Sequence, residues 1–308
     1  MAHIYLYSPS GAVRNKTGYQ RALRRLRAQG HEVEVDPAAW LGHQRFAGDD
    51  ATRLAAIQRA ADSGAQVVMT TRGGYGLTRL LPQLPYDAIQ RSVTQGSAWV
   101  GLSDFTALQL AVLAQRQTPT WAGPALLEDW AGEDEPDEIM QACFDDLVSG
   151  VGEGAGWRLP GGDFKAHPAL SSPDGWGVEG ATLWGGNLSI LCFLLGTPYC
   201  PLVDGGVLFL EDVGEHPYRI ERMLTQLLHA GVLGRQRAVL LGAFNRFELT
   251  PHDKGYKLAS VVDWLRSQLQ VPVLTGLPFG HVPTKVVLPV GQPVDLLVQG
   301  REALLFWG

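Results

Sequence analysis

Residues 98–115 read AWVGLSDFTALQLAVLAQ, and this stretch decides how the rest of the chain is interpreted. Residues 98–100 form a short apolar run typical of a buried strand, and a turn over residues 101–104 follows. Residues 105–114 are almost wholly apolar, which predicts a buried helix. A serine between a strand and a helix holds its hydroxyl clear of both elements, beside the free N–H groups of the helix start. Ser103 is therefore a candidate nucleophile.

The same turn has a simpler interpretation, in which Ser103 or Asp104 caps the start of the helix. A G-x-S-x-G elbow would be stronger evidence for a nucleophile, but Phe105 stands where the second glycine would be. The local sequence leaves both interpretations open.

The composition is that of a globular protein with a sizeable core. The 308 residues are 45% hydrophobic and 18% charged, enough for one large or two ordinary domains. The net charge of -6, with no basic stripe, argues against a nucleic-acid partner. We find no apolar stretch of membrane-spanning length and no signal peptide before the apolar run at residues 3–7, so we expect a cytoplasmic location and no membrane partner.

The three cysteines, Cys143, Cys192 and Cys200, are too few and too irregularly spaced for a disulfide framework or a metal site. They are typical of buried thiols in a reducing compartment. No cluster of histidine, cysteine and acidic residues has the spacing of metal ligands, so we expect no metal and no cofactor.

The first half of the chain alternates between strands and helices, which predicts a parallel sheet covered by helices on both faces. We assign residues 1–150 to this domain. Binding and catalytic sites in such sheets lie at the carboxyl ends of the strands. The segment RGGYG, residues 72–76, and the Ser103 turn both follow predicted strands, so they can meet in space. The predicted strands are 4–7, 32–35, 67–70 and 98–100, and the predicted helices are 17–29, 50–63, 87–94 and 105–114.

The second half mixes helices with short strands. Residues 151–177 are rich in Gly and Pro, and we interpret them as a linker with a surface segment. Residues 178–308 then form a smaller, β-rich and barrel-like α+β domain. Its predicted helices are 187–195, 218–230 and 256–268, and its predicted strands are 207–210, 238–244, 285–288, 294–298 and 303–306.

The glycines of RGGYG allow backbone conformations closed to other residues and let a ligand approach the main chain. A phosphate loop is a poor interpretation, because neither established phosphate-binding motif is present. An oxyanion hole is a second interpretation, with the N–H of Gly74 joining the N–H of Asp104. A plain tight turn is the third.

Two further segments carry candidate catalytic residues. Glu211 ends an apolar strand, where a buried carboxylate needs a partner; its alternatives are a turn cap or a pair with Arg219 or Arg222. His281 lies in the loop Pro-Phe-Gly-His, where a structural role is the alternative. A serine at a turn, a carboxylate at a strand end and a histidine in a loop are together the parts of a nucleophilic triad, in which histidine activates serine and the carboxylate orients histidine.

These motifs together resemble the LD-carboxypeptidases, the murein tetrapeptide carboxypeptidase family of serine peptidases, which includes microcin immunity peptidases. The resemblance implies a Rossmann-like N-terminal domain, a smaller β-rich C-terminal domain, a homodimer and no metal. It implies Ser103 as nucleophile, Glu211 as triad acid, His281 as base, and the N–H groups of Gly74 and Asp104 as oxyanion hole. The motifs that carry it are RGGYG, GLSDFTAL, WGGNLSILCFLLGTPY, GVLFLEDVGEHPYRIERMLTQL and GLPFGH.

The resemblance also implies a reaction and a substrate. It implies release of the terminal D-alanine from L,D-linked muropeptide tetrapeptides in peptidoglycan recycling. One branch of the family instead hydrolyses microcin-type peptide-nucleotides and carries an extended aromatic loop. Residues 161–176 could form such a loop, but they are few and hold one tryptophan, which favours the carboxypeptidase. A non-catalytic ligand-binding protein, with RGGYG as an anion cradle, is the alternative from another class.

Overall fold

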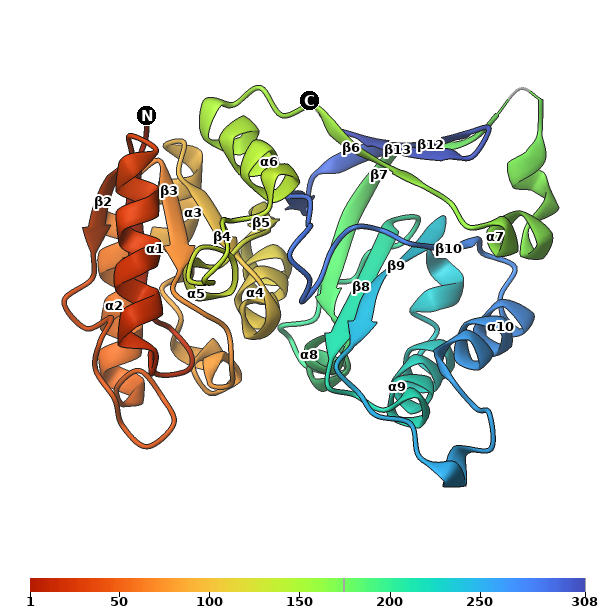
Figure 1. Cartoon of the computed structure of the whole chain (residues 1–308), viewed down its shortest axis with the longest axis horizontal. Coiled ribbons are helices and arrows are strands. Elements are labelled where there is room, and N and C mark those ends of the chain that lie inside the picture. Colours follow the sequence, from red (N-terminus) through yellow and green to blue (C-terminus); the bar gives the residue numbers. More distant parts are fainter. Residues whose placement is uncertain (174, 308) are drawn as a thin grey trace. The chain divides into compact units, whose positions relative to one another are not determined.

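A computed structural model describes residues 1–173 and 175–307, and it divides the chain into two compact units (Figure 1). We expected three continuous stretches, 1–150, 151–177 and 178–308. In the structure the chain instead returns twice to the first unit. The first unit comprises Met1–Gly152, Gly196–Pro201 and Pro283–Gly291, and the second comprises Glu153–Leu195, Leu202–Val282 and the chain from Gln292 onward.

The first unit is built on a six-stranded sheet with the strand order β11-β5-β4-β3-β1-β2. All neighbours are parallel except the edge strand β11, which runs antiparallel to β5. The predicted parallel sheet is thus confirmed. Its strands are β1 (His3–Tyr7), β2 (Glu32–Val35), β3 (Val67–Thr70), β4 (Ala98–Gly101), β5 (Thr120–Ala122) and β11 (Leu288–Val290).

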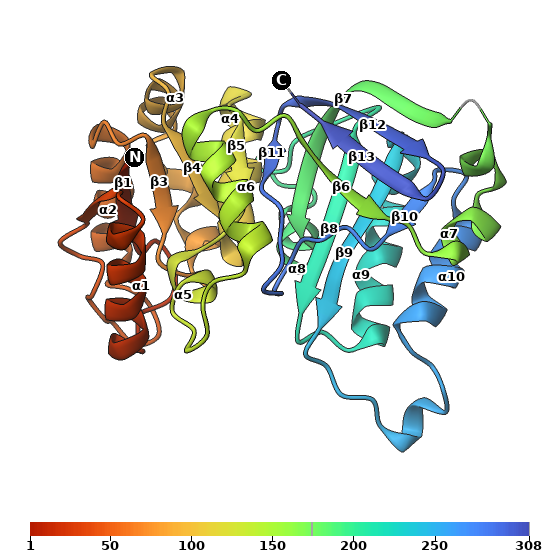
Figure 2. The ribbon, with the colours of Figure 1, turned by 45° about the horizontal axis from the view of Figure 1, so that its top comes forward.

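Helices cover both faces of this sheet, as Figure 2 shows for α1, α5 and α6 in front of it and α2, α3 and α4 behind. The front helices share a core with β1 and β3, in which Tyr19 and Trp130 are fully buried. On the other face α3 lies between α2 and α4. The helices are α1 (Lys16–Ala28), α2 (Asp50–Asp62), α3 (Tyr86–Thr94), α4 (Thr106–Arg116), α5 (Leu126–Asp129) and α6 (Glu138–Ser149).

The second unit has a seven-stranded mixed sheet with the linear order β10-β9-β8-β7-β12-β13-β6. Its first four strands are parallel and the remaining pairings are antiparallel. The helices α8 (Leu188–Leu194), α9 (Pro217–His229) and α10 (Leu258–Gln268) lie next to one another. The strands are β6 (Gly154–Arg158), β7 (Trp176–Asn187), β8 (Val207–Val213), β9 (Ala238–Asn245), β10 (Val273–Thr275), β12 (Pro293–Gln299) and β13 (Glu302–Phe306).

Two sequence-based assignments were wrong. The strand expected at 285–288 in the second domain is β11, Leu288–Val290, and it extends the sheet of the first unit. Pro289 lies in it without disruption because an edge strand need not donate every N–H. The segment 151–177, expected as a linker with a surface segment, does contain the boundary between Gly152 and Glu153, but it also contains β6, which pairs with β13. Its sequence GAGWR has no alternation of polar and apolar residues, so only the partner strand reveals it.

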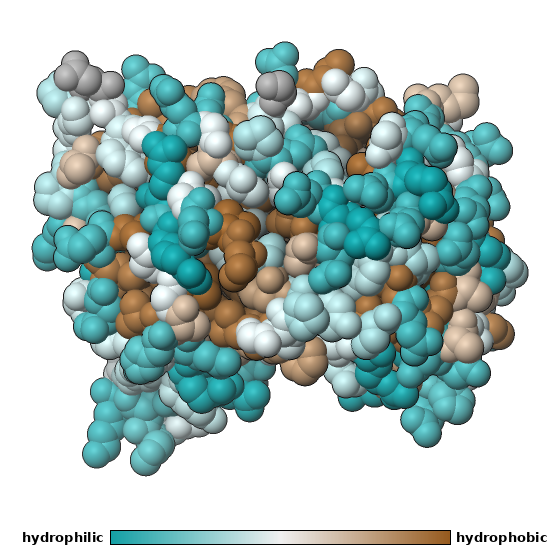
Figure 3. Space-filling view, turned by 180° about the vertical axis from the view of Figure 1, so that it is seen from behind, coloured by the Kyte–Doolittle hydropathy of each residue, from teal (hydrophilic) through white to brown (hydrophobic). Residues whose placement is uncertain are grey.

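Figure 3 shows hydrophilic side chains over much of one face, with smaller hydrophobic areas between them. No helix among the described residues is both long and apolar enough to cross a membrane. Of the three cysteines, Cys192 is buried, and Cys143 and Cys200 are partly buried.

A pair of glycines at the end of β7 lets two backbones come unusually close. Gly185 and Gly186 have φ angles of 127° and 125°, a region that L side chains rarely adopt. A Cβ atom on Gly185 would lie 2.0 Å from the carbonyl oxygen of Phe209 in the neighbouring strand β8. The close pairing of β7 with β8 therefore depends on glycine at this position.

We expect Gly185→Ala to lower the melting temperature by about 10 °C, because backbone strain and overlap with Phe209 together cost about 3–5 kcal/mol. Gly205→Ala is the matched control: its φ is also positive, at 70°, but its Cβ would meet only Cδ of Arg237, at 3.9 Å. The control should lose about 3 °C. Equal shifts for the two variants in thermal denaturation would refute the argument from close approach.

Candidate active site

The Ser103 turn has the strained geometry expected of a functional residue. Ser103 follows β4 and opens the short 3-10 helix Ser103–Phe105, which leads into α4. Its φ is 67°, in the left-handed region that a serine rarely occupies. Neither the 3-10 helix nor α4 has a side-chain cap, so the interpretation of Ser103 or Asp104 as a helix cap is wrong. A Cβ on Gly101 would lie 2.6 Å from the Phe105 ring, so the turn needs glycine at position 101.

The RGGYG segment packs directly against this turn, as expected for two loops that follow adjacent parallel strands. A Cβ on Gly73 would lie 2.7 Å from Cβ and 3.0 Å from Oγ of Ser103. Gly73 is therefore needed where the loop meets the serine. Gly74 has a φ of 117°, so a side chain there would strain the backbone. The backbone of this loop thus lies beside the candidate nucleophile without any intervening side chain.

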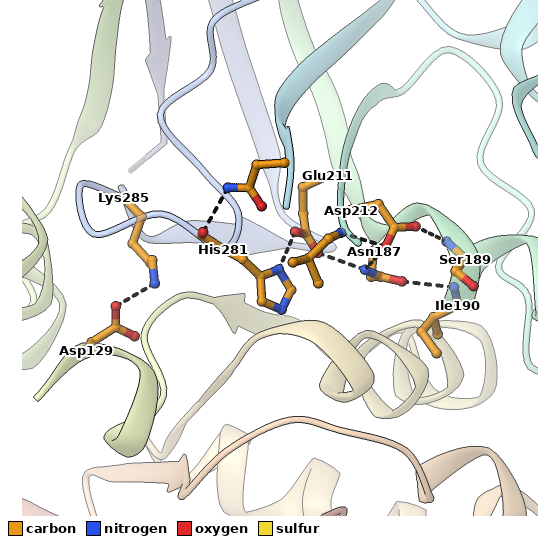
Figure 4. Close-up of polar contacts among 10 residues, drawn as sticks. Asp129, Asn187, Ser189, Ile190, Glu211, Asp212, His281 and Lys285 are labelled. Carbon is orange, nitrogen blue, oxygen red and sulfur yellow. Dashed lines mark hydrogen bonds and ion pairs between the residues drawn. The ribbon is translucent and has the colours of Figure 1, made fainter. Parts of the chain in front are cut away.

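In the second unit, Glu211 and His281 form a hydrogen-bonded pair (Figure 4). Oε2 of Glu211 lies 2.8 Å from Nδ1 of His281. The Glu211 side chain is fully buried, and that of His281 is 7% exposed. Of the alternative partners of Glu211, Arg219 pairs with Glu215 instead. A buried carboxylate on Nδ1 orients the imidazole ring, so that its Nε2 is the nitrogen for exchanging protons with another group.

The His281 loop reaches Glu211 because of the residues before it. Phe279 packs edge-to-face on Phe209 of β8, and its carbonyl accepts a hydrogen bond of 2.8 Å from the N–H of Ala243. Gly280 has a φ of 126°, and a Cβ there would lie 3.2 Å from Oε2 of Glu211. The Phe279 ring anchors the loop, and the glycine leaves space for the carboxylate.

Asn187 joins the two consecutive carboxylates at the end of β8. Its Nδ2 donates to Oε1 of Glu211 and to Oδ1 of Asp212, both at 3.0 Å, while its Oδ1 accepts from the N–H of Ile190 and caps α8. Successive residues of a strand normally point to opposite faces. The register between β8 and β9 shifts between Leu210 and Asp212, which is consistent with a bulge that lets one amide reach both carboxylates.

The sequence analysis did not identify Asn187 and Asp212 as part of this network. In the sequence, Asn187 stands at the start of an apolar helix. This position predicts a helix cap, but it does not indicate a hydrogen bond to a carboxylate elsewhere in the chain. Burial raises the pKa of Asp212 to about 6, and the charge of Glu211 adds to the shift. The N–H groups of Val213 and Ser189, with the Asn187 amide, oppose this rise.

The chain enters the first unit soon after His281. Lys285 is 1% exposed, and its Nζ lies 2.5 Å from Oδ1 of Asp129, a buried ion pair also drawn in Figure 4. Thr284 donates to Asp137 at 2.5 Å. These bonds hold the segment that leads into β11. Among residues 1–173 and 175–307, no group of three or more His, Cys, Asp or Glu side chains is arranged to hold a metal ion.

Comparisons with known proteins agree with this architecture. Residues 4–123 match the LD-carboxypeptidase N-terminal domain, and residues 180–296 match the LD-carboxypeptidase C-terminal domain. The chain therefore belongs to the LD-carboxypeptidase family. It is an enzyme, a serine-type LD-carboxypeptidase, which decides against the alternative of a non-catalytic binding protein.

Individual relatives cover from 73% to 99% of this chain. The crystal structure of a muramoyltetrapeptide carboxypeptidase from Oxalobacter formigenes is 37% identical, with a TM-score of 0.84 over 99% of this chain and 98% of that one. The murein tetrapeptide carboxypeptidase of Pseudomonas aeruginosa is 28% identical over 95% of this chain and 92% of its own length. The microcin C7 self-immunity protein MccF of Escherichia coli is 28% identical over 73% of this chain and 69% of its own.

The raised pKa of Asp212 predicts a pH-dependent contribution to stability. As the pH falls through about 6, the folded protein takes up a proton at Asp212, whereas the unfolded chain does so only near 3.8. The parent therefore gains about 2 kcal/mol of stability between pH 7.5 and 4.5 that Asp212→Asn cannot gain. Melting temperatures across this range should shift in favour of the parent as the pH falls. Parallel curves would contradict the burial effect.

Proposed function

We propose that this protein is a carboxypeptidase that releases the terminal D-alanine from L,D-linked muropeptide tetrapeptides. In this proposal it acts in the cytoplasm, as a homodimer, in peptidoglycan recycling. Support for the substrate comes from the relatives, two of which are described as muramoyltetrapeptide or murein tetrapeptide carboxypeptidases. Support for the chemistry comes from the two groups of residues described above.

The observation that carries the proposal is the buried hydrogen bond between Glu211 and Nδ1 of His281. We assign His281 as the base and Glu211 as the acid that orients it, with Ser103 as the nucleophile. Serine ionises far too weakly at neutral pH to act alone, so it needs a base to take its proton. The Nε2 atom of His281 would take that proton as Oγ attacks the carbonyl carbon, and would return it to the leaving amine.

The first unit would supply the oxyanion hole. In a tetrahedral intermediate the former carbonyl oxygen carries the negative charge, and backbone N–H groups aimed at it stabilise the transition state. We assign the N–H groups of Gly74 and Asp104 to this role. Contact between Gly73 and Ser103 supports the assignment, because it brings the glycine loop next to the nucleophile. Water would then release the acyl group by the reverse sequence of proton transfers.

The segment 161–176 bears on the microcin-type alternative. In the structure it forms α7 (Gly161–Ala166) and a 3-10 helix, with Asp174 outside the described residues. Asp163 accepts hydrogen bonds from Arg266 of α10 and from the N–H of Thr275 in β10, the edge strand of the sheet. Glu211 lies on β8, two strands from this edge. This anchoring favours the carboxypeptidase over a peptidase that needs an extended aromatic loop at its site.

The substrate is tested by incubating the protein with a muropeptide tetrapeptide that ends in D-alanine and with its L-alanine counterpart. We expect free alanine from the first peptide alone, because the bond cleaved joins an L-centre to a D-residue. A microcin-type peptide-nucleotide serves as a third substrate. If the protein cleaved this compound but released no D-alanine from the tetrapeptide, the proposed substrate would be wrong and the microcin-type substrate would be favoured.

The catalytic assignments are tested by Ser103→Ala and His281→Gln, each expected to lower kcat on the order of 10⁶-fold. His167→Gln is the matched control, because His167 also accepts a hydrogen bond in the second unit, from the N–H of Val273 at 3.0 Å, and has no assigned role. The control should retain most of the parental kcat. Circular dichroism verifies folding. Residual activity above a few per cent in a folded Ser103→Ala protein would remove Ser103 from the mechanism.

A further inference from the structure

The carboxylate of Asp104 lies where three segments of the first unit meet. Asp104 is 1% exposed, although its backbone belongs to the nucleophile turn. Its Oδ2 accepts a hydrogen bond of 2.7 Å from the hydroxyl of Ser10, in the turn after β1. The same oxygen accepts one of 2.9 Å from the N–H of Leu77, directly after RGGYG. One oxygen atom therefore ties both neighbouring loops to the turn that carries Ser103.

The loop tied in this way is confined on two sides. Gly73 lies against Ser103, as described above, and its carbonyl accepts a hydrogen bond of 3.3 Å from the N–H of Gly11. A Cβ on Gly74 would lie 3.4 Å from Cα of Gly11. Because the loop fits between the Ser103 turn and the Ser10 turn, the Asp104 hydrogen bonds to those two segments fix the position of Gly74.

The charge of Asp104 has a nearby counterpart in Arg53. The Arg53 side chain is fully buried; its Nη1 donates to the carbonyl of Pro9 at 2.9 Å, and its Nη2 forms an ion pair with Asp50. Burial raises the pKa of Asp104 to about 6, while the hydrogen bonds from Leu77 and Ser10 and the charge of Arg53 lower it. Among the described residues, Oδ1 of Asp104 has no hydrogen-bond partner. The donors that hold this carboxylate through Oδ2 thus come from the adjoining loops.

We propose that the Asp104 carboxylate is a positioning residue that fixes the two donors of the oxyanion hole relative to each other. The inference rests on the proposed function, in which the N–H groups of Gly74 and Asp104 are those donors. The backbone of Asp104 supplies one donor, and its side chain holds the loop that supplies the other. Moving the donors apart would break the hydrogen bonds to Ser10 and Leu77.

Three variants and one control separate this role from a general effect on folding. Asp104→Ala removes the acceptor, Asp104→Asn removes the charge but keeps the shape, and Ser10→Ala removes one donor. Ser8→Ala is the matched control. Ser8 lies in the same turn, is 2% exposed and forms hydrogen bonds to the carbonyl of Ala39 at 2.9 Å and to the hydroxyl of Thr71 at 2.6 Å, but it has no hydrogen bond to Asp104.

We expect Asp104→Ala to lower kcat for D-alanine release about 100-fold, the loss typical of one oxyanion donor, with KM nearly unchanged. Asp104→Asn and Ser10→Ala should lose about 10-fold, since part of the hydrogen bonding remains. Ser8→Ala should keep the parental kcat. Hydrogen exchange of residues 72–77 should become faster in both Asp104 variants and in Ser10→Ala, but not in Ser8→Ala.

Phosphonylation of Ser103 by a small fluorophosphonate provides a readout that needs no peptide substrate. Its rate should fall with Asp104→Ala in the same proportion as kcat. Unchanged kcat and phosphonylation in folded Asp104→Ala would overturn the inference, as would a KM effect without a kcat effect. If the parent released no D-alanine but reacted at Ser103, the proposed substrate would fail and the phosphonylation rates would still decide the role of Asp104. No reaction at Ser103 in the parent would refute both.

Discussion

The Glu211 carboxylate is fully buried at the end of β8, and the surrounding residues offset the free-energy cost of that burial. An ionised carboxylate without solvent is stable only if hydrogen-bond donors replace the water it has lost. His281 provides one partner and Asn187 another. Because the Asn187 amide also bonds Asp212, the orientation of its nitrogen is determined by two acceptors at once. The environment that satisfies Glu211 therefore also orients His281.

The same constraint explains where glycine is required. Groups that exchange protons must come within hydrogen-bond distance, which leaves no space for intervening side chains. Gly280 provides this space beside Glu211 in the second unit, and Gly73 provides it beside Ser103 in the first. In the second unit, the aromatic residue before Gly280 anchors the backbone, because Phe279 packs on Phe209. Close backbone approach and rigid anchoring thus occur together.

Buried charge plays a similar part in the first unit. Asp104, Arg53 and the ion pair of Lys285 with Asp129 are all withdrawn from solvent. Each of these groups would be costly to bury alone, and each bonds segments that are distant in sequence. Lys285 lies 156 positions from Asp129, and Asp104 lies 94 positions from Ser10. Such bonds specify one arrangement of loops, because any other arrangement leaves a charge without partners.

The sequence by itself determined the parallel sheet of the first unit, most helices, and the candidates Ser103, Glu211 and His281. These features follow from local signals: apolar periodicity, turn residues, and reactive side chains at strand ends. Only the tertiary structure decided that β11 joins the first unit, that Glu211 bonds His281 rather than an arginine, and that Asn187 and Asp104 hold the surrounding loops. Edge-strand pairing and buried hydrogen bonds join residues far apart in the chain, and a local pattern carries no information about such partners.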